Sequence, residues 1–165
     1  MNKLVTFMLA TILILPVWNP AAHAAGNGSI TLTLDAAKEI EITGPQGKKE
    51  IKRVSPSLVT PGEEVIYTLS YTNNGKEMAQ DLFITNPIPP HMIYKANSAR
   101  GENTVIVYSI DGAKSFDKPE NLKIRGIDGK ERSATPVNYS HIRWVIKKPL
   151  APGEKGDVSF RAQLQ

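Results

Sequence analysis

The chain has 165 residues, a formal net charge of +4 and no cysteine. The absence of cysteine excludes disulfides, thiol catalysis, iron–sulfur clusters and a cysteine-linked lipid anchor. Its 20 basic and 16 acidic residues are interspersed, which argues against a nucleic-acid partner, because such a partner needs basic residues gathered on one face.

Residues 1–24 have the three parts of a secretory signal peptide. A charged start at Lys3 precedes an apolar stretch, and small residues lead to Ala24. We therefore predict cleavage before Ala25 and export to the periplasm or the medium. A membrane anchor is disfavoured because Pro16 interrupts the apolar stretch, which is shorter than the roughly 20 residues of a spanning helix. No later segment is apolar enough to span a bilayer.

Beyond the signal peptide, apolar and polar residues alternate with period two, which is typical of half-buried strands. Residues 25–54 are predicted to form N-terminal strands and a hairpin, either part of the following domain or leading into it. Residues 55–165 are predicted to form one antiparallel β-sandwich domain. The expected strands are residues 30–34, 39–43, 50–54, 64–72, 80–86, 104–109, 122–125, 142–147 and 157–165.

Trp144 is in phase with the apolar residues of its expected strand, and we predict that it is buried between the sheets. Three residue pairs indicate turns. Pro61-Gly62 and Pro152-Gly153 fit type II turns, in which glycine supplies the positive φ. Asn74-Gly75 is a favoured hairpin pair, predicted to return the chain through residues 81–90. Because the Pro-Gly-Glu turns share no longer similarity, they indicate one sandwich that uses the same turn twice, not a tandem repeat.

The segments PGEEVIYTLSYTNNG, DLFITNPIPPHMIY and HIRWVIKKPLAPGEKGDVSFRAQL, in this order, resemble the domain of unknown function 11 family. The resemblance covers about residues 55–165. It implies an immunoglobulin-like or prealbumin-like β-sandwich exposed outside the cytoplasm, in bacterial or archaeal surface or envelope proteins, without catalytic residues. Many members carry the domain in tandem arrays, whereas this chain has a single copy, which argues against a stalk or spacer role.

No residue pattern indicates catalysis, a cofactor or a metal. Beyond the signal peptide the histidines are His91 and His141. Without cysteine, a four-ligand zinc site would need both histidines and two carboxylates to converge, so we expect surface or strand-end histidines instead. Ser140 precedes His141 and is expected on the opposite strand face, so the two are not expected to act together. Paired acids at residues 63–64 and at residues 117 and 120 fall in predicted turns, where charge is solvated. The sequence thus predicts that the protein is not an enzyme.

Residues 109–116, SIDGAKSF, resemble the Asp-box hairpin S-x-D-x-G-x-x-W of sialidases, with Ala113 and Phe116 as departures. We expect a turn in which Asp111 accepts hydrogen bonds from nearby backbone amides. The alternative that Asp111 and neighbouring carbonyls bind calcium, which takes six or more oxygen ligands, is left open.

Together these features predict an exported, non-enzymatic protein that acts by contact with an unknown protein or envelope component. Because loops often carry recognition, we expect the partner to contact residues 97–140, at a surface that includes Phe116, Arg125, Arg132 and Tyr139. A long hairpin with solvated charge is the alternative for this segment. The alternative function is a carbohydrate- or glycan-binding module, for which the unassigned aromatics would have to line one exposed surface: Phe83, Tyr94, Tyr108, Phe116 and Tyr139.

Overall fold

The computed structural model describes residues 29–165, so the predicted signal peptide lies outside the described residues. The fold is all-β, and every strand pairing is antiparallel. Single-turn 3₁₀ helices occur at Pro45–Gly47, Pro119–Asn121 and Pro136–Asn138. Within residues 29–165, no helix has the length and apolar character needed to cross a bilayer.

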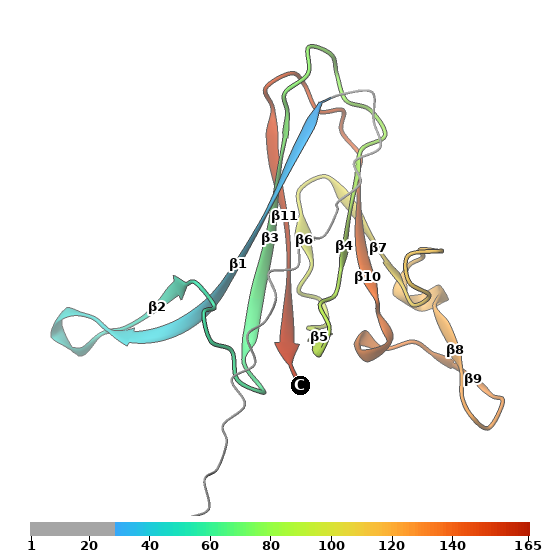
Figure 1. Ribbon diagram of the computed structural model, residues 1–165, viewed down its shortest axis with the longest axis horizontal. Helices are drawn as coiled ribbons and strands as arrows, with labels where there is room; N and C mark the ends of the chain where they lie inside the picture. Colours follow the sequence, from blue (N-terminus) through green and yellow to red (C-terminus); the bar gives the residue numbers. More distant parts are fainter. Residues whose placement is uncertain (1–28) are drawn as a thin grey trace, which may run out of the picture.

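Two sheets face each other (Figure 1). The larger sheet has the order β2-β1-β3-β11-β5, with β6 also pairing with β11. Its strands are β1 (Ile30–Thr43), β2 (Lys49–Val54), β3 (Glu64–Asn73), β5 (Met92–Tyr94), β6 (Arg100–Gly101) and β11 (Lys155–Leu164). The smaller sheet has the order β4-β10-β7, from β4 (Phe83–Pro87), β10 (His141–Ile146) and β7 (Thr104–Ser109). A separate hairpin joins β8 (Lys123–Arg125) to β9 (Glu131–Ser133).

The strand order differs from that of an immunoglobulin constant domain. When β2 and the β8–β9 hairpin are set aside and β5 and β6 are counted as one strand, the sheets read 1-2-7-4 and 3-6-5 in chain order. The constant domain reads 1-2-5-4 and 3-6-7. The fifth and the last strands have therefore exchanged sheets, and the last strand, β11, lies in the middle of the larger sheet.

The core lies between the two sheets, where alternate side chains of the facing strands meet. Trp144 of β10 is 0% exposed, and its ring lies 6.1 Å from that of Phe160 on β11. Phe160 also stacks on Tyr67 across the β3–β11 pair, at 4.9 Å between ring centroids. The largest fully buried apolar side chains come from both sheets: Leu69, Leu82, Ile84, Ile142, Trp144, Val158 and Phe160.

The two Pro-Gly-Glu turns have the same geometry. Gly62 and Gly153 have φ of +91° and +77°, the left-handed conformation in which glycine is favoured. In each turn the glutamate that follows folds back on the turn. Glu63 accepts a hydrogen bond from the backbone N–H of Thr60 at 2.6 Å, and Glu154 accepts one from the N–H of Ala151 at 2.9 Å. The repeated triplet is thus a self-capped turn, a role for the glutamates that the sequence analysis did not assign.

The predicted hairpin at Asn74-Gly75 is wrong, because β3 pairs with β1 and β11, and the chain crosses to the smaller sheet to form β4. The buried side chain of Asn73 holds this crossover. Its amide donates to the carbonyls of Glu77 and Leu150 at 2.7 and 2.9 Å, and its carbonyl accepts from Gly75 N–H at 2.9 Å. Asn74-Gly75 therefore lies where the chain leaves the larger sheet for the smaller one, and it does not form a tight hairpin turn.

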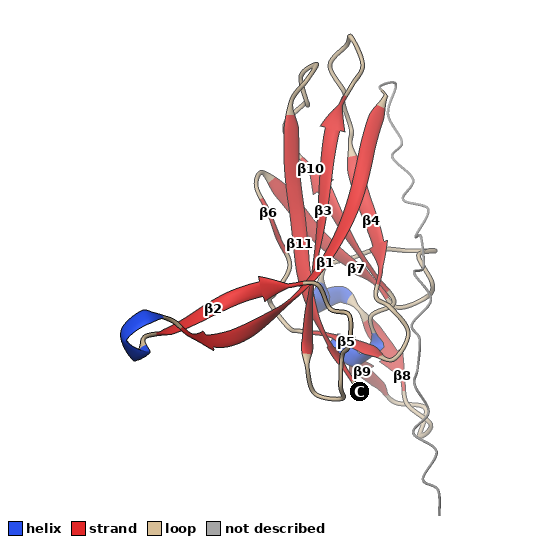
Figure 2. Ribbon diagram, turned by 60° about the vertical axis from the view of Figure 1, so that its left-hand side comes forward, coloured by secondary structure: helices blue, strands red, loops and turns tan. Residues whose placement is uncertain are grey.

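The N-terminal residues form one long strand where two were expected. Residues 30–37 of β1 pair with β3 inside the sandwich, whereas residues 38–43 pair with β2. Figures 1 and 2 show this second part, with β2, extending away from the other strands. We call residues 38–54 the arm. The sandwich therefore begins before residue 55, and the division falls within β1.

Candidate interaction surface

The structure does not bring the four predicted surface residues together. Tyr139 is 9% exposed and stacks on Tyr108 at 4.6 Å between ring centroids, with Tyr94 at 6.0 Å. The hydroxyls of Tyr94 and Tyr108 lie 2.9 Å apart, so the three tyrosines form one buried cluster. The prediction that Tyr139 lines an interaction surface is wrong, because its ring packs in the core.

Phe116 is half-buried and lies against the smaller sheet. The guanidinium carbon of Arg143 is 3.7 Å from the Phe116 ring centroid and 4.5 Å from that of Phe83. Arg143 Nε also donates to Thr85 Oγ1 at 2.8 Å, which fixes the guanidinium over the rings. Both phenyl rings are therefore engaged within the chain by cation–π contacts.

Arg125 and Arg132 are exposed on the β8–β9 hairpin, which extends from the lower right of the sandwich in Figure 1. Arg132 pairs with Asp128 at 2.7 Å in the connecting turn. Ile127 in the same turn is 111% exposed. This part of residues 97–140 is a hairpin with solvated charge, apart from the single isoleucine.

Residues 109–116 form a turn closed by the carboxylate of Asp111. Asp111 Oδ1 accepts hydrogen bonds from the backbone N–H groups of Lys114 and Ser115 at 3.1 and 3.0 Å and from Ser109 Oγ at 2.7 Å. Oδ2 accepts from Ser115 Oγ at 2.6 Å. These bonds, that from the Ser115 side chain above all, hold the pKa of Asp111 well below its usual range. In residues 29–165, no group of three or more His, Cys, Asp or Glu side chains is arranged to hold a metal ion.

Ser140 and His141 do lie together, contrary to expectation. Ser140 Oγ is 3.1 Å from His141 Nδ1, because Ser140 precedes β10 and its side chain need not follow the alternation of side chains along that strand. The Ser140 hydroxyl is also within hydrogen-bond distance of the carbonyl of Ser109, at 3.1 Å. Burial lowers the pKa of His141, as does the nearby charge of Arg143.

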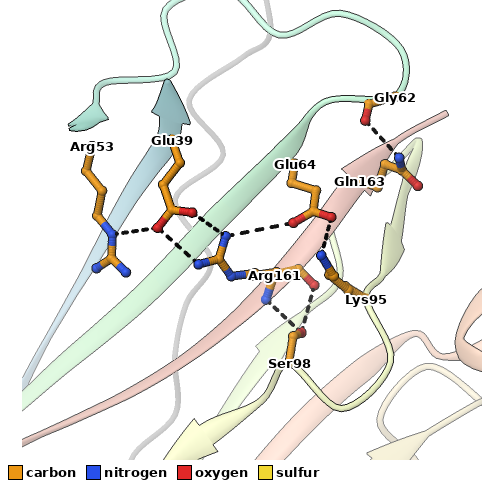
Figure 3. Close-up of polar contacts among 8 residues, drawn as sticks. All are labelled: Glu39, Arg53, Gly62, Glu64, Lys95, Ser98, Arg161 and Gln163. Atoms are coloured by element: carbon orange, nitrogen blue, oxygen red, sulfur yellow. Dashed lines mark hydrogen bonds and ion pairs between the residues drawn. The ribbon is translucent and has the colours of Figure 1, made fainter. Parts of the chain in front are cut away.

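A charged cluster that the sequence analysis missed lies on the outer face of the larger sheet (Figure 3). Arg161 of β11 binds Glu39 of β1 through both terminal nitrogens, at 2.9 and 3.0 Å. Arg53 of β2 reaches the same carboxylate at 3.2 Å. Glu64 of β3 lies 3.8 Å from Arg161 and pairs with Lys95, which follows β5. We call these five residues the Arg161 cluster.

The Arg161 cluster joins the arm to the sandwich. The hydrogen bond from Arg161 lowers the pKa of Glu39, and the same bond raises the pKa of Arg161. The loop after β5 is tied to the same strand, because Ser98 Oγ accepts from Arg161 N–H at 3.0 Å. The one sign of this cluster in the sequence was the alternation of residues 157–165, which places Arg161 on the solvent face.

A pocket of about 340 Å³ adjoins the Arg161 cluster. Four cations line it, from the arm, from the loop after β5, from β6 and from β11: Arg53, Lys95, Arg100 and Arg161. Thr68, Ser98 and Ser159 also line it. The walls can therefore donate many hydrogen bonds and attract negative charge.

No protein-family model matches the chain, and neither do the curated proteins or the solved structures with which it was compared. The function is therefore argued from the arm, the pocket and the surface charges.

Proposed function

We propose that the protein is an exported, non-enzymatic β-sandwich that binds another protein or a component of the cell envelope. The signal-peptide pattern of residues 1–24 supports export. The order of strand and turn motifs in residues 55–165 supports a single-copy module of the domain of unknown function 11 type, related to the immunoglobulin-like or prealbumin-like sandwiches. Two antiparallel sheets around one core fit such a module.

The arm is the observation that carries this proposal. Its apolar side chains Ile40, Ile42, Ile51 and Val54 belong neither to the core nor to the residues packed against it within the described part of the chain. Ile51 is 73% exposed. An isolated two-stranded ribbon is only marginally stable in water, and this one gains nothing from the core. Its use is therefore contact with another molecule.

The free edge of β2 fits a protein partner. Among residues 29–165, β2 ends the larger sheet and pairs with β1 alone, so half of its backbone N–H and C=O groups are available to a further strand. The strand carries Lys49, Lys52 and Arg53 but one carboxylate, Glu50. Lys49 and Arg53 pair with Glu41 and Glu39 of β1. Lys52 has no such partner within residues 29–165, and its charge opposes pairing between identical edges and favours a partner strand with acidic side chains.

The experiment is photo-crosslinking in intact cells, with a photoreactive amino acid at Ile51 and, as a matched control, at Lys76. Lys76 is an exposed loop residue outside the arm. We expect a discrete protein adduct from position 51 that is missing from position 76. Equal adducts from both positions, or none from position 51, would overturn the proposal.

Glycan binding through stacked aromatics finds less support. Tyr94, Tyr108 and Tyr139 are buried, and the rings of Phe83 and Phe116 are engaged by Arg143. The aromatic residues considered for a sugar platform are therefore already used inside the fold.

A further inference from the structure

We infer that the pocket beside Arg161 is a binding site for a phosphate or sulfate group, either as the free ion or carried on a sugar. The pocket has a volume of about 340 Å³, within the range of small-ligand sites. It lies on the outer face of the larger sheet, where the arm leaves the sandwich. The inference does not depend on the partner proposed for the edge of β2.

The charge of the pocket matches a dianion. Its four lining cations are accompanied by the two carboxylates of the Arg161 cluster, Glu39 and Glu64, and four minus two leaves two positive charges. Arg100 accounts for part of this excess. Its Nη1 donates to the carbonyls of Asn97 and Ala99 at 2.7 and 2.8 Å, and no carboxylate of residues 29–165 pairs with it.

The excess positive charge also distinguishes a binding site from a cluster that only holds the arm to the sandwich. A network that only held the arm to the sandwich would need Glu39 with Arg53 and Arg161, which are present. Lys95, on the loop after β5, and Arg100, the first residue of β6, lie beyond this contact, yet they line the same pocket. Lys95 is paired with Glu64, but Arg100 has no carboxylate partner in residues 29–165. Gathering like charges costs free energy, so this uncompensated charge points to an anion.

The donors suit tetrahedral oxyanions. Arg161 is held by two hydrogen bonds to Glu39, and so its guanidinium is fixed before a ligand arrives. Guanidinium groups carry five N–H donors, so Arg161 keeps donors beyond the two that Glu39 accepts, and Thr68 and Ser159 line the same pocket. The pocket offers no exposed aromatic ring, since its one aromatic, Phe160, is fully buried. Charge and hydrogen bonds, not stacking on a sugar, therefore select the ligand.

The test is isothermal titration calorimetry of the protein at neutral pH and low ionic strength. The probes are inorganic phosphate, inorganic sulfate, glucose 6-phosphate and glucose. We expect saturable binding of the three anions and none of glucose. Lys95→Gln combined with Arg100→Gln should weaken binding by about tenfold or more. The control, Lys76→Gln with Lys155→Gln, removes the same charge from exposed positions and should change binding by less than about twofold.

Tighter binding of glucose 6-phosphate than of phosphate would assign the site to a phosphorylated sugar, and equal binding would assign it to the free ion. An equal loss in the two double variants would overturn the inference, as would unsaturable binding. Should Lys95→Gln with Arg100→Gln fail to fold, Arg100→Gln alone decides, because it breaks no ion pair. It should weaken binding by about threefold, and unchanged binding would reject the site. None of these variants alters Ile51, so this outcome and the photo-crosslinking outcome are separable.

Discussion

Replacement of Trp144 by alanine is the sharpest test of where the core lies. The side chain is 0% exposed and lies between the sheets, against Phe160. Deleting a buried tryptophan costs the transfer free energy of the indole and leaves a cavity that two facing sheets cannot close. We expect the free energy of unfolding to fall by about 3–5 kcal/mol. For a domain whose total stability is about 5–15 kcal/mol, this is a large fraction.

Trp144→Phe is the matched variant. The indole Nε1 has no hydrogen-bond partner among the described residues, so phenylalanine breaks no hydrogen bond and keeps most of the ring. We expect it to cost about 1–2 kcal/mol, well below the alanine variant. Similar losses in the two variants would show that the volume of the side chain is not what matters at this position.

Urea unfolding followed by circular dichroism gives both free energies. Fluorescence quenching adds an independent measure, because Trp18 lies within residues 1–24 and a chain starting at Ala25 has Trp144 as its one tryptophan. Iodide should quench the folded protein far less than the unfolded one. Rapid quenching in the folded state, with an unchanged melting midpoint for Trp144→Ala, would refute the burial argument.

Three further outcomes are expected. Gly62→Ala and Gly153→Ala should each lower the unfolding free energy by roughly 1 kcal/mol, because their φ is positive while a Cβ would meet no atom within 4 Å; variants more stable than the parent would contradict the turn geometry. Replacing residues 40–52 by Asn-Gly should move the melting midpoint by less than about 3 °C, since the arm lies outside the core; a larger loss would show that the arm packs on it. The pKa of Asp111 is lowered in the folded state, so its contribution is complete above the ordinary carboxyl value and is lost as the pH falls. The difference in melting midpoint between the protein and Asp111→Asn should therefore narrow below about pH 4, and a constant difference would mean that the charge of Asp111 is unimportant.

The fold class could be predicted because it depends on local patterns. Alternation along residues 157–165 places Val158 and Phe160 in the core, and proline followed by glycine marks two turns. Pairing between strands depends on contacts far apart in the chain, which alternation does not encode. Alternation therefore predicts neither the position of β11 between β3 and β5 nor a strand after Asn73 in the opposite sheet.

The candidate site was harder to predict for the same reason. Glu39 and Arg161 are 122 positions apart, and each alone is an ordinary surface charge. Tyr139 lies between a 3₁₀ turn and β10, where no alternation of apolar and polar residues assigns its side chain to one face of a sheet. The continuous strand β1 was also missed, because its central residues alternate less clearly than its ends.

The position of β11 bears on how the chain reaches its folded state. β1 and β3 are made early, but the strand that joins β3 to β5 and supplies Phe160 ends at Leu164. While the polypeptide emerges from a ribosome, the larger sheet has a gap between β3 and β5 until that residue is free. The core between the sheets is therefore incomplete until synthesis has reached β11. A nascent chain arrested before Lys155 would present Trp144 and its neighbours to chaperones and proteases.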